Sequence, residues 1–185
     1  MLMRTFSILG LVAMLFAPVS QTLAQGAGIN WLSFEELEAA QQEEPRKVMI
    51  DVYTKWCGPC KMMMRNTFTN ADVIAYLNTN FYAVKFNAES PEDVTWGGKT
   101  YSNPNYVQGK PGRNGVHHLS RKLGVNAYPT LVYLDENSEM IAPVSGYKSP
   151  QQIELYLRFF NDAWFKGMEQ AIWDDFQKGF TSTFK

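Results

Sequence analysis

The two cysteines of the chain, Cys57 and Cys60, are separated only by Gly58 and Pro59. Two thiols at this spacing can close a small disulfide and open it again, with the thiolate as the nucleophile in exchange. Because the sequence holds no third cysteine, no structural disulfide competes for either sulfur. The pair therefore predicts a thiol–disulfide oxidoreductase with a redox-active Cys57–Cys60 disulfide.

The surrounding residues predict different roles for the two sulfurs. An apolar strand, 47–53, precedes the pair, and residues 61–65 continue it as a helix, so Cys57 is expected at a helix N-terminus. There, unpaired backbone N–H groups and the positive end of the helix dipole stabilise a thiolate. We expect Cys57 to attack a substrate disulfide. Cys60, one turn along and more buried, should resolve the mixed disulfide.

Half of a zinc site is the alternative for such a pair of cysteines. A structural zinc site needs four ligands, and only the adjacent His117 and His118 remain to complete one. A closely spaced cysteine pair between a strand and a helix is more typical of redox chemistry. We therefore predict neither a metal nor another cofactor.

Residues 1–24 have the features of a secretory signal. Arg4 gives a positive start, residues 6–17 are apolar, and Thr22-Leu23-Ala24 offers a cleavage site after Ala24. An uncleaved anchor is the alternative, but the apolar stretch is short of the roughly 20 residues of a membrane span. The prediction is an exported, periplasmic protein. In an oxidising compartment a single close cysteine pair favours a working dithiol over a structural staple.

The rest of the composition predicts a single globular domain over residues 25–185. The whole chain holds 17 basic and 18 acidic side chains, and its aromatic content is 14%. A nearly neutral chain argues against nucleic-acid or anionic-membrane partners, which would need a basic patch. The aromatic content supports a packed core.

The order of predicted elements indicates an α/β fold. A capping box, Ser33 with Glu36, opens a helix over 34–42, and Ser149 with Gln152 opens the last major helix. Further helices are predicted over 71–77 and 116–123, and strands over 47–53, 81–87, 130–135 and 140–144. Strands separated by helices pair in parallel, whereas the late hairpin must be antiparallel. We expect a central mixed sheet flanked by helices on both faces.

Two segments fall outside this pattern. The insert 89–114 is long for a loop, and residues 94–101 within it form a predicted hairpin with a Gly-Gly turn. Its aromatic residues either border a substrate groove or decorate the surface. The helical tail 166–185 repeats apolar residues every four positions, namely Met168, Ile172, Phe176, Phe180 and Phe184. We expect this tail to pack on the domain, with a partner or membrane surface as the alternative.

The segment Trp56-Cys57-Gly58-Pro59-Cys60-Lys61, after a strand containing Asp51, resembles the active-site region of thioredoxins. Segments 84–87, 123–130 and 144–146 resemble the family's third strand, its cis-proline loop and the glycine region before its last helix. The resemblance spans about 48–160. The insert and the tail depart from the short thioredoxin pattern and look more like exported thioredoxin-like proteins of a type seen in Bacteroidetes.

The resemblance implies a thioredoxin fold and gives supporting roles to two polar residues inside apolar strands. Asp51 matches the buried aspartate that exchanges a proton with the resolving cysteine, and burial should raise its pKa. Lys85 matches the lysine that pairs with this aspartate. The alternatives are a solvent-facing Asp51 and an outward-facing Lys85, since lysine is rarely buried unpaired.

The resemblance also implies a substrate-binding surface. Pro129 should follow a cis peptide bond and lie beside Cys57, although an ordinary trans proline is the alternative. Trp56 should lie at the surface beside the sulfur rather than in the core, and Tyr128 should touch substrate. Gly58, Pro59 and Gly146 complete the predicted surface.

The Gly-Pro dipeptide between the cysteines resembles reducing thioredoxins more than strong oxidases. The prediction is a monomeric protein-disulfide reductase whose substrates are proteins with disulfides. Reduction outside the cytoplasm would need a membrane-embedded electron donor. An oxidase or isomerase is the alternative within the same chemistry. A non-catalytic binding module with a static disulfide is the alternative outside it.

Overall fold

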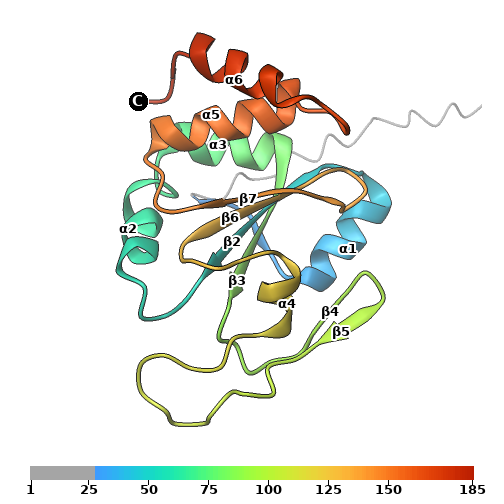
Figure 1. Cartoon of the computed structure of the whole chain (residues 1–185), viewed down its shortest axis with the longest axis vertical. Coiled ribbons are helices and arrows are strands. Elements are labelled where there is room, and N and C mark those ends of the chain that lie inside the picture. The colour runs from blue at the N-terminus through green and yellow to red at the C-terminus, as the bar shows by residue number, and fades with distance from the viewer. Residues whose placement is uncertain (1–27) are drawn as a thin grey trace, which may run out of the picture.

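The computed structural model describes residues 28–185, so the predicted signal segment 1–24 lies outside the described residues. Five strands form the central sheet, in the order β1-β3-β2-β6-β7 (Figure 1). They are β1 (Trp31–Leu32), β2 (Lys47–Tyr53), β3 (Phe81–Asn87), β6 (Thr130–Leu134) and β7 (Met140–Ser145). Strands β1, β3 and β2 run parallel, and β6 and β7 are antiparallel. The predicted mixed sheet is confirmed. Strand β1 was not predicted, because two residues are too few to show a period.

The helices cover both faces of this sheet (Figure 1). They are α1 (Phe34–Glu43), α2 (Gly58–Asn66), α3 (Ala71–Asn80), α4 (His118–Lys122), α5 (Pro150–Arg158) and α6 (Gln170–Gly179). Helix α5 continues into a π-helical turn, η1 (Phe159–Ala163). Both predicted capping boxes are present, at Ser33 with Glu36 and at Ser149 with Gln152. A cap of this kind stabilises a helix by about 1 kcal/mol, which explains why both starts were visible in the sequence.

Alternation along β2 separates two apolar cores. Val48, Ile50 and Val52 pack with residues of α1 and α4 on one face. Met49 packs on the other face with residues of α2, α3 and α5. Since side chains alternate along a strand, Asp51 shares the face of Met49. The central strand therefore directs this carboxyl group toward the side of the sheet that α2 covers.

The insert 89–114 leaves the sheet and forms its own hairpin from β4 (Val94–Trp96) and β5 (Lys99–Tyr101). Both turn glycines, Gly97 and Gly98, have positive φ, as the tightest hairpin turns require. Asn103 fixes the following loop by donating from Nδ2 to the carbonyl groups of Ser90 (3.0 Å) and Gly115 (2.7 Å). The predicted hairpin is confirmed.

The C-terminal tail packs on the domain, but only part of it is helical. Trp173 and Phe176 lie against the core cluster of α3 and α5, as predicted. The prediction of one continuous apolar face on a helix over residues 166–185 was wrong in two respects. Ile172 is 38% exposed, and the helix ends at Gly179. The chain then returns in an extended conformation and buries Phe184.

A buried carboxylate on α5 holds this returning segment. Glu154 is fully buried and accepts hydrogen bonds from Thr183 N–H (2.8 Å), Phe184 N–H (2.9 Å) and Ser182 Oγ (2.5 Å). Arg158 Nε donates to it at 3.0 Å. Burial acts to raise the pKa of Glu154, but these hydrogen bonds together lower it to about 2. The tail is therefore clamped by a charged acceptor.

Candidate functional site

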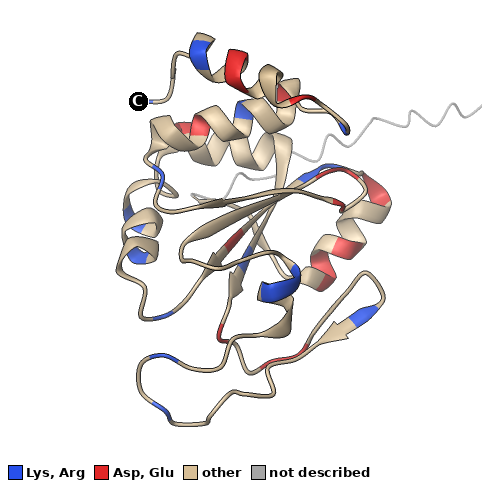
Figure 2. Ribbon diagram, viewed as in Figure 1, with Lys and Arg blue, Asp and Glu red and all other residues tan. Residues whose placement is uncertain are grey.

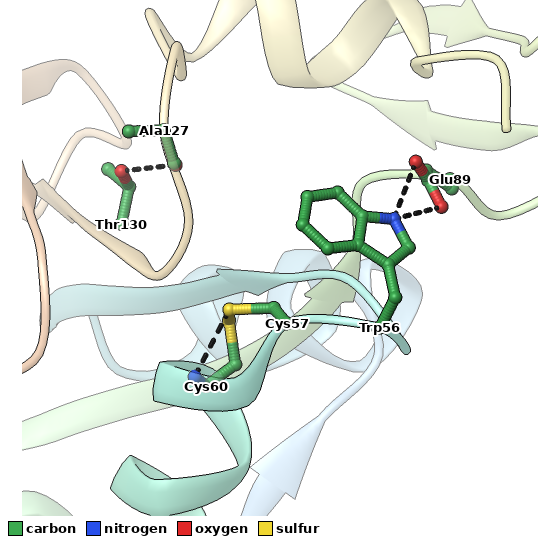
Figure 3. Close-up of a disulfide and its surroundings, with 6 residues drawn as sticks. All are labelled: Trp56, Cys57, Cys60, Glu89, Ala127 and Thr130. Carbon is green, nitrogen blue, oxygen red and sulfur yellow. Dashed lines mark hydrogen bonds between the residues drawn. A yellow bond between two sulfur atoms is a disulfide. The ribbon is translucent and has the colours of Figure 1, made fainter. Parts of the chain in front are cut away.

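The two cysteines form a disulfide at the start of α2 (Figure 3). Their Cα atoms lie 5.3 Å apart. Cys57 is the N-cap of α2, and its Sγ accepts the backbone N–H of Cys60 at 3.1 Å. This position confirms the predicted placement of Cys57 at a helix N-terminus. The two sulfurs are bonded to each other, so in this form neither is available as the zinc ligand that the alternative interpretation required.

Both cysteines are buried in this disulfide form. Cys57 is 2% exposed and Cys60 is 4% exposed, so the prediction that Cys60 is the more buried sulfur was wrong. Figure 3 shows the loop that carries Ala127 and Thr130 beside the disulfide, on another side than α2. Thr130 Oγ1 braces this loop by donating to the Ala127 carbonyl at 2.8 Å. Gly58 and Pro59, between the sulfurs, are exposed.

The loop that faces the disulfide contains the predicted cis peptide bond, between Tyr128 and Pro129. The Pro129 carbonyl accepts the backbone N–H of Gly146 at 2.8 Å. Gly146 has φ +88°, a conformation that favours glycine. Lys148 Nζ donates to the Gly146 carbonyl at 3.0 Å. The fold thus joins the two segments that carry Pro129 and Gly146.

Trp56 is half-buried and is held by the insert. Its Nε1–H donates to both oxygens of the Glu89 carboxylate at 3.0 Å (Figure 3). The Arg113 guanidinium lies over the ring at 4.5 Å from its centroid, and Tyr128 contacts the ring edge-on at 5.9 Å. Glu89 also accepts the backbone N–H of Asn114 at 3.0 Å. The insert is therefore attached directly to the residue that precedes Cys57.

Asp51 is buried at the centre of the sheet. It is 2% exposed, and burial raises its pKa to about 7, with the charge of Lys85 acting in the opposite direction. Lys85 is its register partner on β3 and is half-buried. The Lys85 ammonium lies over the Tyr53 ring, 4.8 Å from its centroid. The buried Asp51 is as predicted. Lys85 is neither fully buried beside Asp51 nor fully exposed to solvent, so it lies between the paired and the outward-facing alternatives.

One hollow includes Cys60 in its lining, and another includes Trp56, the residue before Cys57. One, of about 500 Å³, is lined by Cys60, Tyr53, Lys85 and residues of α2. The other, of about 540 Å³, is lined by Trp56, Lys55, Glu89 and the insert. Lys55 borders both.

Sequence reasoning missed the residues of the insert that reach this site. Glu89, Arg113 and Asn114 lie in a segment with no period, and nothing in their spacing points to Trp56. A glutamate just after a buried strand was the one available signal. The sequence left two roles equally open for the insert aromatics, a border of the substrate groove and a surface position; Tyr106 lines the hollow beside Trp56.

Within residues 28–185, none of the helices has the length and apolar character needed to cross a membrane.

Comparison with known proteins agrees with this geometry. A family model described as a thioredoxin-like domain matches residues 34–161. The chain is 25% identical over 153 residues to the thiol:disulfide interchange protein DsbD of Pectobacterium atrosepticum, covering 79% of this chain and 22% of that protein. It is 28% identical over 126 residues to the chloroplastic thioredoxin F-type of Spinacia oleracea, covering 68% of this chain and 50% of that protein. The chain therefore spans at most half the length of these two relatives.

Solved structures give the same fold. A thioredoxin-fold protein from Helicobacter pylori is 14% identical, with a TM-score of 0.56, and the match covers 84% of this chain and 89% of that one. A candidate disulphide-isomerase from Bacteroides thetaiotaomicron is 26% identical, with a TM-score of 0.51, and the match covers 77% of this chain and 100% of that one.

Proposed function

The chain belongs to the thioredoxin-like domain family, and we propose that it reduces disulfide bonds in other proteins outside the cytoplasm. The observation that carries the proposal is the position of Cys57. Its sulfur caps α2 and already accepts a backbone N–H, from Cys60. A thiolate at this position would keep that hydrogen bond and the favourable helix dipole, both of which lower a thiol pKa.

The first step would be attack by the Cys57 thiolate on one sulfur of a substrate disulfide. A mixed disulfide forms between Cys57 and that sulfur, and the second substrate sulfur leaves as a thiolate that takes up a proton. The surface for the substrate would be Trp56, Gly58, Pro59, Tyr128, Pro129 and Gly146. Gly58 and Pro59 lie between the two cysteines on α2, and Trp56 precedes Cys57. A hydrogen bond from Gly146 N–H to the Pro129 carbonyl joins the two loops that carry the remaining residues of this proposed surface.

The second step would be attack by Cys60 on the Cys57 sulfur. This step releases the substrate as a dithiol and leaves the Cys57–Cys60 disulfide that the structure contains. The Cys60 thiol must lose a proton first, and Asp51 is the proposed acceptor. Asp51 lies on the α2 side of the sheet, and a pKa of about 7 allows it to take and return a proton near neutral pH.

A complete cycle needs two electrons to reopen the Cys57–Cys60 disulfide. We propose that a membrane-embedded donor supplies them and that the protein itself acts as an exported, periplasmic monomer after cleavage at Ala24. The similarity to an interchange protein supports exchange with protein partners. The similarity to a Bacteroides structure supports the Bacteroidetes-type assignment.

Insulin reduction tests the proposal. The wild type should accelerate insulin reduction by dithiothreitol, whereas Cys57→Ser should give only the uncatalysed rate. Cys60→Ser is the matched variant, because it retains the nucleophile and should accumulate covalent mixed disulfides with protein substrates. Wild-type activity equal to that of Cys57→Ser would leave a non-catalytic binding module, and no mixed disulfide on Cys60→Ser would count against protein substrates.

An oxidase or isomerase is the second candidate, and one observation favours it. The Bacteroides structure that aligns over its full length is a candidate disulphide-isomerase. The reduction potential of the Cys57–Cys60 couple separates the candidates, since reducing thioredoxins lie near about −270 mV and strong oxidants near about −120 mV. A potential near the oxidant end would overturn the proposed direction.

A further inference from the structure

Basic side chains line the hollow beside Cys60 and the hollow beside Trp56 in this otherwise nearly neutral chain, and we propose that they select substrate segments with acidic residues on both sides of the target disulfide. The inference rests on the proposed exchange activity and names its substrate class. Figure 2 shows basic segments on α2 and on the insert loop, whereas acidic segments concentrate on α1 at the other side of the sheet.

All the charged residues that line the hollow beside Cys60 are basic. Lys55, Lys61, Arg65 and Lys85 line it, and no acidic residue of the described chain does. Lys55, Lys61 and Arg65 are exposed. Acidic side chains that followed the target disulfide into this hollow would meet up to four cations.

The hollow beside Trp56 continues this charge on the insert side. Lys55 and Lys110 line it, and Arg113 lies over the Trp56 ring. Its one acidic residue within 28–185, Glu89, is buried, with its oxygens occupied by Trp56 Nε1–H and the Asn114 N–H. The cations of this hollow are exposed and the carboxylate is not.

The nearby exposed acids face a different hollow. Glu92 and Asp93 on the hairpin side of the insert, together with Glu35 of α1, line a third hollow that also contains Lys55 and Lys85. That hollow touches neither cysteine nor Trp56. The cationic region is therefore continuous from Lys61 to Lys110 through Lys55, which borders both hollows.

A surface field of one sign raises the rate at which oppositely charged partners associate, by about tenfold or more, and salt removes the effect. Exposed pairs add little affinity once formed. We therefore expect the selectivity to reside in kcat/KM and to depend strongly on ionic strength.

The test uses the pre-reduced full chain and three synthetic peptides that share one disulfide loop. Two flanking residues on each side are Asp, Asn or Lys in the three peptides. Single-turnover reduction transfers two electrons from the Cys57–Cys60 dithiol to the peptide, so no external donor is needed. At low salt the Asp peptide should react about tenfold faster than the Asn peptide, and the Lys peptide more slowly than both.

Two variants locate the effect. Lys55→Gln/Lys110→Gln removes two of the cations that line these hollows and should lower the Asp-to-Asn rate ratio. Salt at about 0.5 M, where the Debye length is only a few ångströms, should bring the ratio close to one. Lys122→Gln/Lys178→Gln removes the same charge from α4 and α6 and should keep the ratio. Equal rates for the three peptides, or loss of the ratio in both double variants, would overturn the inference while leaving the exchange activity intact. Failure to reduce any peptide would instead overturn the proposed function.

Discussion

Asp51→Asn isolates the effect of burying one ionisable group on the face of the sheet that α2 covers. Asp51 is 2% exposed, and burial raises its pKa from 3.8 to about 7. Each unit of pKa difference between the folded and unfolded states corresponds to about 1.4 kcal/mol. The shift of Asp51 therefore amounts to about 4 kcal/mol.

The sign follows from which state holds the proton more tightly. The folded protein binds the Asp51 proton more strongly than the unfolded chain does, because ionisation in the core is costly. The stability that the folded protein gains from this tighter proton binding is fully present below pH 3.8 and is lost as the pH rises through about 7. The side-chain amide of the Asp51→Asn protein has no proton to lose in this range. The stability of this variant relative to the wild type should therefore rise by about 4 kcal/mol between about pH 4 and pH 9.

Urea unfolding of the oxidised proteins at intervals from about pH 4 to pH 9 measures this change. Keeping the Cys57–Cys60 disulfide closed prevents titration of the thiols. The quantity compared is the difference in unfolding free energy between the variant and the wild type, followed as the pH changes. Titrating groups that the two proteins share cancel in this difference. Asp93→Asn, the same substitution at an exposed position, controls for the loss of one carboxylate. Parallel stability profiles for the wild type and Asp51→Asn would refute the reasoning.

Three further substitutions test the insert and the tail. A Cβ at Gly115 would lie 2.4 Å from the carbonyl group of Asn105, so Gly115→Ala should displace the insert and speed its amide hydrogen exchange; unchanged protection would contradict the packing. Glu154→Gln should lower the free energy of unfolding by about 3 kcal/mol near neutral pH, and this difference from wild type should close as the pH falls from 4.5 toward about 2. A difference that does not change with pH would refute the idea that an ionised Glu154 holds the tail. Glu89→Leu removes both acceptors of the Trp56 N–H, so it should cost about 2 kcal/mol and change the tryptophan fluorescence, whereas an unaltered spectrum would argue against the observed hydrogen bond.

The parts of this protein that the sequence predicted depend on local chemistry. Ser33 and Ser149 each accept the backbone N–H of the glutamate or glutamine three residues on, whose side chain accepts the serine N–H in return. Gly97 and Gly98 fit a two-residue hairpin turn. Cys57 was placed at a helix start because a strand and a helix flank it within a few residues. The cis bond before Pro129 came from family resemblance, since nothing in the local residues requires it.

The cysteine pair, the helices and strands apart from β1 and η1, and the apolar run that buries Asp51 were all visible in the sequence. The surroundings of the cysteine pair became clear only from the packing of the folded chain. Glu89 lies 33 residues from Trp56 yet binds its indole, Lys85 rests on Tyr53, and Cys57 is as buried as Cys60. The physical reason is that caps, turns and strand alternation act between near neighbours. Contacts between distant segments depend on how the insert and the loops pack, and no local pattern encodes that packing.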